Sequence, residues 1–160
     1  MFDIKPTKAY KLNNAFLLDD GNTPVLANSS YNNGIGGYST LEATEEGNII
    51  TFSDTVDANT IFYQEHEFIG YAHVQGMYPK DNYKQQWNDY CLKFFASVFR
   101  VTALLKGYNY GNKFRRDHAM QTSILLPATP SGSPDWDYME AYMKEMEEKA
   151  IKRIETLSKS

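Results

Sequence analysis

The 160-residue chain lacks several features that mark common protein classes. Its one cysteine, Cys91, excludes an internal disulfide and a zinc site made of several cysteines. No apolar run approaches the roughly 18–20 residues of a membrane-spanning helix, and Met1 is not followed by the apolar core of a signal peptide. The chain has 20 acidic against 16 basic residues, and the net charge of −4 argues on its own against nucleic-acid binding.

Patterns that carry catalysis are also scarce. Pro134-Asp135 and Glu147-Glu148-Lys149 superficially match a nuclease motif, but on one helix they lie about 18 Å apart and cannot share a metal ion. The three histidines form no i,i+4 pair, and the glycine-rich run 33–37 lacks the spacing of a nucleotide-binding loop. We therefore expect a non-enzymatic protein without metal ligands or a cofactor of its own.

What is present suffices for one compact domain. Hydrophobic residues make up 42% of the chain and aromatic residues 14%, which is enough for a real core. The first 80 residues contain short β-prone runs separated by turn-forming residues, which predicts mostly sheet. The predicted strands lie near residues 16–18, 24–27, 49–52, 60–64, 68–78 and 122–126.

From residue 81 the hydrophobic residues recur at steps of three and four, which predicts an amphipathic helix over roughly 82–105. Asp81 or Asn82 can cap its start, and Gly107 can end it. The residues of the predicted apolar face are Trp87, Cys91, Phe94, Phe95, Val98, Thr102 and Leu105.

A second long helix is predicted at the C-terminus, with Ser133 as its N-cap and Pro134 at its first position. Its apolar residues follow the spacing of a short coiled coil. The stripe could pack on its own domain, but we favour a partner helix. The residues of this predicted seam are Trp136, Met139, Met143, Met146 and Leu157.

The predicted fold is therefore α/β, close to α+β. It has a mixed twisted sheet, a central amphipathic helix and a long C-terminal coiled-coil helix. We expect a globular domain at 1–132 and a spacer and dimerisation helix at 133–160.

The charge is segregated along the chain. Residues 1–79 carry a net charge of −7, whereas residues 80–116 carry +6. A local excess of this size is either a solvated helix face or an electrostatic footprint for nucleic acid. If the positive segment is such a footprint, the net charge of −4 no longer argues against nucleic-acid binding.

Two polar loops, at 28–38 and 106–116, carry groups that bond base edges and phosphates. We expect the basic side chains to hold phosphate or guanine, the asparagines to read base edges and the tyrosines to pack on sugar or base. The candidate DNA-binding residues are Asn32, Asn33, Tyr38, Lys106, Tyr108, Tyr110, Asn112, Lys113, Arg115 and Arg116.

Several of these runs resemble target-recognition domains of restriction-modification specificity (S) subunits, of type I or the related types IIB and IIG. The similar runs are LANSSYNNGIGGY at 26–38, GNIITF at 47–52, GNKF at 111–114, ILLP at 124–127 and GSPDW at 132–136, followed by Met139-Glu140 and Tyr142-Met143. The last stretch resembles the family's passage from the domain into its spacer helix and is the most specific. Together the matches extend from about residue 24 to 145.

The resemblance implies a non-catalytic subunit, or half-subunit, that recognises a sequence in double-stranded DNA. It would direct a partner adenine methyltransferase, and a nuclease, to a bipartite site. S-adenosylmethionine is expected on the methyltransferase and not on this chain. The resemblance also implies the cytoplasm of a bacterium or archaeon, with no membrane contact.

One difference from the family is informative. A typical specificity subunit has two recognition domains and two spacer helices, whereas this sequence has one of each. We expect either a homodimer through the C-terminal helix or one domain of a longer protein. The alternative function is a protein-interaction module that assembles through its C-terminal helix without direct DNA contact.

Overall fold

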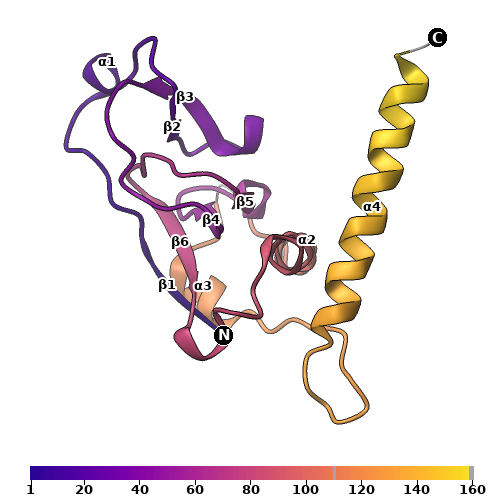
Figure 1. Cartoon of the computed structure of the whole chain (residues 1–160). Helices are drawn as coiled ribbons and strands as arrows, with labels where there is room; N and C mark the ends of the chain where they lie inside the picture. The colour runs from indigo at the N-terminus through magenta and orange to yellow at the C-terminus, as the bar shows by residue number, and fades with distance from the viewer. Residues whose placement is uncertain (110, 159–160) are drawn as a thin grey trace.

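The computed structural model describes residues 1–109 and 111–158 (Figure 1). Its main sheet has four strands in the order β1-β6-β4-β5, all paired antiparallel, and a smaller antiparallel sheet pairs β2 with β3. The strands are β1 (Phe2–Pro6), β2 (Thr23–Leu26), β3 (Ile35–Ser39), β4 (Ile49–Ser53), β5 (Phe62–Gln64) and β6 (Val74–Pro79). The helices are α1 (Asn14–Leu17), α2 (Asp89–Leu105), α3 (Arg116–Gln121) and α4 (Trp136–Leu157), with 3-10 turns η1 (Asn32–Gly34), η2 (Ala58–Thr60) and η3 (Asp81–Tyr83).

β4 lies at the centre of the molecule, because all five of its residues are buried. Successive side chains of a strand point to opposite faces. Ile50 and Phe52 pack with the apolar face of α2, and Ile49 packs with Leu26 and Phe68 on the other side. The domain therefore has α2 on one face of the main sheet and the β2–β3 sheet on the other. The predicted α+β class is confirmed.

α2 begins later than the sequence predicts. The Asn88 side chain accepts a hydrogen bond from the Cys91 amide and caps the helix, while residues 81–83 form the separate 3-10 turn η3. Trp87 is fully buried but precedes the helix. The buried face of α2 also differs, because Leu105 is 84% exposed. That face consists of Cys91, Leu92, Phe95, Ala96, Phe99 and Ala103.

α4 begins at Trp136, and Asp135 caps it by accepting from the Tyr138 amide. The predicted cap Ser133 and first residue Pro134 are therefore wrong by two positions. Both belong to a closed loop, in which the Thr129 amide donates to the Ser133 carbonyl and Pro134 bridges to residue 128. Asp135 suits the cap because a carboxylate is favourable at a helix N-terminus.

The first half of α4 packs on its own domain. The Trp136 ring meets Trp87 edge to face at a centroid distance of 4.6 Å, Tyr142 meets Phe94 in the same way at 5.7 Å, and Met139 is 0% exposed. Figure 1 shows α2 between the main sheet and α4. Trp136 and Met139 therefore face their own domain, whereas the predicted partner seam requires them to face outward.

Two predicted strands do not form. Residues 16–18 lie in and just after α1, and residues 122–126 follow α3 as unpaired extended chain. Ile124 and Leu126 pack against the core, whereas Leu125 is 93% exposed. The apolar pattern at 122–126 reflects packing of alternate side chains without strand pairing. The predicted strand at 68–78 is shorter in the structure, since β6 begins at Val74.

Candidate nucleic-acid interface

The loop at 28–38 makes a sharp turn at η1. Asn32, Asn33 and Gly34 follow one another with φ values of 48°, 53° and 78°, a left-handed conformation that glycine and asparagine tolerate best. The turn brings the Asn33 amide back toward β5, where it donates to the Tyr63 carbonyl at 3.1 Å and to Gln64 Oε1 at 3.2 Å. Asn33 therefore anchors the loop, and Asn32 beside it is exposed.

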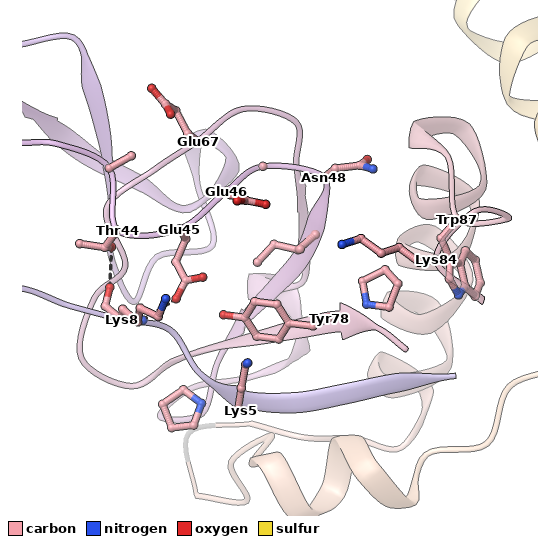
Figure 2. Close-up of a pocket in the computed structure, with 15 residues that line it drawn as sticks. Lys5, Lys8, Thr44, Glu45, Glu46, Asn48, Glu67, Tyr78, Lys84 and Trp87 are labelled. Carbon is pink, nitrogen blue, oxygen red and sulfur yellow. Dashed lines mark hydrogen bonds between the residues drawn. The ribbon is translucent and has the colours of Figure 1, made fainter. Parts of the chain in front are cut away.

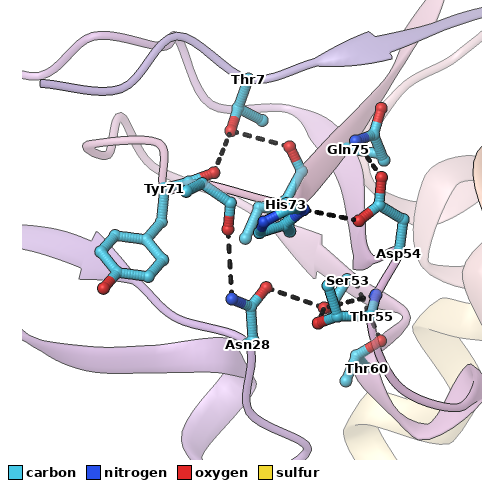
Figure 3. A network of polar contacts seen from close by, with 11 residues as sticks. Thr7, Asn28, Ser53, Asp54, Thr55, Thr60, Tyr71, His73 and Gln75 are labelled. Atoms are coloured by element: carbon cyan, nitrogen blue, oxygen red, sulfur yellow. Dashed lines mark hydrogen bonds and ion pairs between the residues drawn. The ribbon is translucent and has the colours of Figure 1, made fainter. Parts of the chain in front are cut away.

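Asn28 anchors the start of the same loop (Figure 3). Its Nδ2 donates to the Ala72 carbonyl at 3.1 Å, and its Oδ1 accepts from Ser53 Oγ at 2.8 Å. Between the two anchors Tyr31 is 81% exposed, a candidate contact that is absent from the predicted set although it lies in the same loop as Tyr38 and has the same side chain. Tyr38, on β3, is also exposed.

The loop at 106–116 is held by aromatic packing. The Tyr108 ring stacks on His118 at 4.8 Å and lies 5.2 Å from Phe114, so Tyr108 is largely a packing residue. Lys106 Nζ donates to Thr122 Oγ1 at 3.1 Å. The Asn112 side chain is exposed, and the backbone N–H of Asn112 donates to Asn109 Oδ1. Tyr110 lies outside the described residues.

Three basic residues flank the buried Phe114 in the sequence. The Arg115 guanidinium pairs with Asp117 at 2.8 Å, which raises the pKa of Arg115 and lowers that of Asp117. Arg116, the first residue of α3, is exposed, and Lys113 is half-buried. The Phe114 amide donates to the Val56 carbonyl at 2.8 Å and ties the segment to the turn after β4.

The turn at 53–57 makes a hydrogen bond with each of the two polar loops. Asn28 binds it at Ser53 and Phe114 binds it at Val56. Three residues of chain span at most about 11 Å, so the loops are anchored within that distance of each other. The structure thus anchors the start of the first loop and residue 114 of the second loop to the same turn, at the end of β4. The sequence did not single out this turn, which has no pattern beyond ordinary turn-forming residues.

The basic residues of 80–116 do not form a single face. Lys80 pairs with Asp3 at 3.7 Å, and Lys93 pairs with Glu147 of α4 at 3.6 Å. Lys113, Arg115 and Arg116 flank Phe114, the residue that bonds to the 53–57 turn. The electrostatic footprint is consequently smaller than the segment charge of +6 indicates.

A cavity of about 690 Å³ lies beside β1 and β6, and its lining shares no residue with the two polar loops (Figure 2). Lys5 and Lys84 line it together with Glu45, and the Lys5 ammonium lies 4.4 Å from the centroid of the Tyr78 ring. Burial raises the pKa of Tyr78. Because cations and carboxylates are mixed here, the cavity has no strong attraction for a polyanion.

An apolar groove of about 810 Å³ runs between α2, α4 and residues 125–127. Met143 and Met146, two of the predicted seam residues, line it with Val98, Val101 and Tyr142. Leu157, further along α4, is 67% exposed. An apolar surface of this kind favours a protein partner.

Among residues 1–109 and 111–158, no group of three or more His, Cys, Asp and Glu side chains is placed to hold a metal ion. Within the same residues, no helix combines the length and the apolar character needed to cross a membrane.

Comparison with known proteins supplies further evidence. The family model described as the type I restriction modification DNA specificity domain matches residues 1–156. The type II restriction enzyme specificity subunit S.BcgI of Heyndrickxia coagulans is 32% identical over 136 residues, which cover 83% of this chain and 38% of that protein. The crystal structure of the type I restriction-modification S subunit from M. genitalium matches 98% of this chain and 40% of its own, with a TM-score of 0.62 and 12% identity. The chain thus spans about two fifths of the length of both proteins.

Proposed function

Since the chain belongs to the DNA specificity domain family of type I restriction-modification systems, we propose that it recognises one half of a bipartite site in duplex DNA. One observation carries this proposal. Asn28 of the first polar loop and Phe114 of the second are bound to the same turn at 53–57, which supports a shared role for the amide, phenol and guanidinium groups of the two loops. Such groups hydrogen-bond base edges and neutralise phosphates.

The residues of the two loops divide into contacts and anchors. Arg116, Lys113 and Arg115 would hold phosphate or guanine, with Arg115 exchanging Asp117 for DNA. Asn32 and Asn112 are exposed and suit base edges. Asn33 would act indirectly, because its amide already fixes the loop to β5. A bidentate contact with adenine needs one Nδ2 hydrogen, and because both are used for Tyr63 and Gln64, at least one of these bonds would have to break.

A single recognition domain would read half of a site, so the complete site needs a second recognition domain, which a second copy of this chain would supply. α4 supports pairing through its second half, where Ile151, Ile154 and Leu157 are 50%, 66% and 67% exposed. A partner helix would remove these side chains from water and cover the groove beside α2. The proposed assembly is a homodimer with two-fold symmetry, and its DNA site would be an inverted repeat.

The chain would act through a methyltransferase. We expect the partner to hold S-adenosylmethionine and to methylate adenine, while this chain selects the site. A nuclease would reach the same site through the complex. The chain itself would contribute DNA contacts and the docking surface of α4.

The experiment is retention of a short duplex by the purified chain at several salt concentrations. If Lys106, Lys113, Arg115 and Arg116 contact phosphates, affinity should fall with salt along a log–log slope of about −3 to −4. A measurable affinity that does not change with salt would contradict direct DNA binding through these residues.

The second candidate function is a protein-interaction module without DNA contact. The apolar groove and the exposed stripe of α4 favour it, because both would be covered in an assembly. An assembly held by apolar contact should persist at high salt, whereas DNA binding should not. Assembly without any duplex retention at low salt would favour this second function.

A further inference from the structure

His73 has a backbone conformation that glycine adopts at lower cost. Its φ is 67°, and it precedes β6 in a turn closed by a hydrogen bond from the Val74 amide to the Tyr71 carbonyl. The other described residues that have positive φ and are not glycine are three asparagines, Asn32, Asn33 and Asn48. A glycine would make this turn without strain. An imidazole in such a position is a reason to look for a function.

The imidazole is held on one side and open on the other (Figure 3). Its Nδ1 lies 3.3 Å from Asp54 Oδ1, and the side chain is 63% exposed. Asp54 is fixed in turn, because its Oδ2 accepts from Nε2 of the buried Gln75 at 2.8 Å. With Nδ1 facing Asp54, the other ring nitrogen, Nε2, remains for a ligand.

His73 also lies beside the proposed DNA interface. The carbonyl of the preceding residue, Ala72, accepts from Asn28 at the start of the first polar loop. The carbonyl of His73 accepts from the Asp54 amide at 2.9 Å, in the turn that joins the two loops. The backbone at residues 72 and 73 is therefore bonded to the first polar loop and to the 53–57 turn, both of which belong to the proposed DNA interface.

We propose that His73 hydrogen-bonds a base edge through Nε2 and that Asp54 is its positioning residue. This inference rests on the proposed function. A base edge suits the pair better than a phosphate, because the Asp54 carboxylate offsets any positive charge on the ring. Base contacts require a side chain held in one geometry. The contact of Gln75 with Asp54 and the contact of Asp54 with His73 hold the imidazole in this way.

The experiment is selection from a random-sequence duplex library, followed by sequencing of the retained duplexes. The purified 160-residue chain is compared with His73→Gly and Asn48→Gly. Both substitutions place glycine at a positive φ, and Asn48 lies at the opposite end of β4 from Asp54. Thermal unfolding of each variant shows whether the fold is kept. His73→Asn is a second test variant, because asparagine tolerates this conformation.

The wild-type chain should enrich a motif, and His73→Gly should lose the preference at one or two of its base pairs by about fivefold to tenfold. Asn48→Gly should keep the whole motif. Asp54→Asn should weaken the preference at the same base pairs that His73→Gly affects, and a merely structural role would not produce that coincidence.

Two results would overturn the inference while leaving the proposed function intact. One is an unchanged motif in folded His73→Gly and His73→Asn. The other is an equal loss for every sequence, which would indicate a phosphate contact. No enrichment by the wild-type chain at low salt, where even a few phosphate contacts give measurable binding, would instead contradict the proposed function itself.

Discussion

The guanidinium groups of Arg115 and Arg116 are neighbours in sequence but differ in their surroundings. Arg115 is paired with Asp117 in the unbound chain, and Arg116 is exposed at the first position of α3. Binding of DNA by Arg115 must first break an ion pair, which reduces the net gain. Arg116 should therefore contribute more to DNA affinity than Arg115.

We predict that Arg116→Ala lowers duplex affinity about threefold to tenfold near 0.1 M salt and reduces the salt slope by about one. Arg115→Ala should have the smaller effect. The matched control is Lys144→Ala, which removes a positive charge from α4, where Lys144 pairs with Glu140. A fluorescence titration at four salt concentrations measures all three. Equal losses for Arg116→Ala and Lys144→Ala would show that only total charge matters.

Cys91 is fully buried under α4, and burial raises the pKa of its thiol from 9.0 to about 11. Because the thiolate is the reactive form, the native chain should react with a thiol reagent at pH 8 at least about a hundredfold more slowly than the unfolded chain. The raised pKa also stabilises the fold below pH 9, and that contribution is lost as the pH rises toward 11. Rapid labelling of the folded chain at pH 8 would contradict this burial.

Asn33 and His73 show how far the role of a single residue can be predicted from its sequence. Asn33 has the right chemistry for a base edge, and its engagement by Tyr63 and Gln64 depends on residues about 30 positions away. His73 has no metal or catalytic spacing, so its φ and its contact with Asp54 are visible only in the fold. Residue types led to the choice of the two loops, which stays a prediction, and tertiary contacts decide which side chains of those loops are available.

At the scale of elements, α4 has two halves with different roles. Met139 is buried against α2, while Met146 is 39% exposed in the groove. We predict that Met139→Ala lowers the free energy of unfolding by about 2–4 kcal/mol, because it leaves a cavity in the core. Met146→Ala should cost less than about 1 kcal/mol. Urea unfolding of both variants measures the difference, and equal costs would contradict the assignment of Met139 to the core.

The second half of α4 should govern association and not folding. We predict that Ile154→Lys shifts the purified chain toward monomer by at least about tenfold in dissociation constant, since a charge would enter an apolar contact. Its melting temperature, extrapolated to low concentration, should stay that of the wild type. Sedimentation at several concentrations measures the shift, with Lys152→Ala as a control on the same helix. A dimer unaffected by Ile154→Lys would exclude this part of α4 from the contact.

The two long helices were predictable because each has a sustained apolar period, but their starts were not. Asn88 and Asp135 are the caps, although Asp81, Asn82 and Ser133 are equally good cap residues in the sequence. Burial of Trp87 and the closed loop before Asp135 decide between them. The strand predicted at 122–126 failed for a similar reason, since its apolar residues pack on the core without a partner strand.

In the molecule as a whole, the distribution of charge makes strong DNA binding by a single copy unfavourable. Several basic residues of the positive segment are paired within the chain, and the net charge stays at −4. Few phosphate contacts give weak binding at physiological salt. Two copies, or one copy held by a methyltransferase, would combine two weak sites into one stronger site. This arrangement fits a subunit that selects a site within a larger complex.

Methylation-sensitive sequencing of a host that carries this chain with its cognate methyltransferase shows most directly whether the chain selects a site in DNA. We predict a new adenine-methylated motif in two parts separated by a spacer, symmetric if two copies of the chain form the complex. The motif should disappear when the chain is omitted and the methyltransferase is kept. Absence of any new motif with both proteins present, or the same motif without this chain, would show that the chain does not select the site.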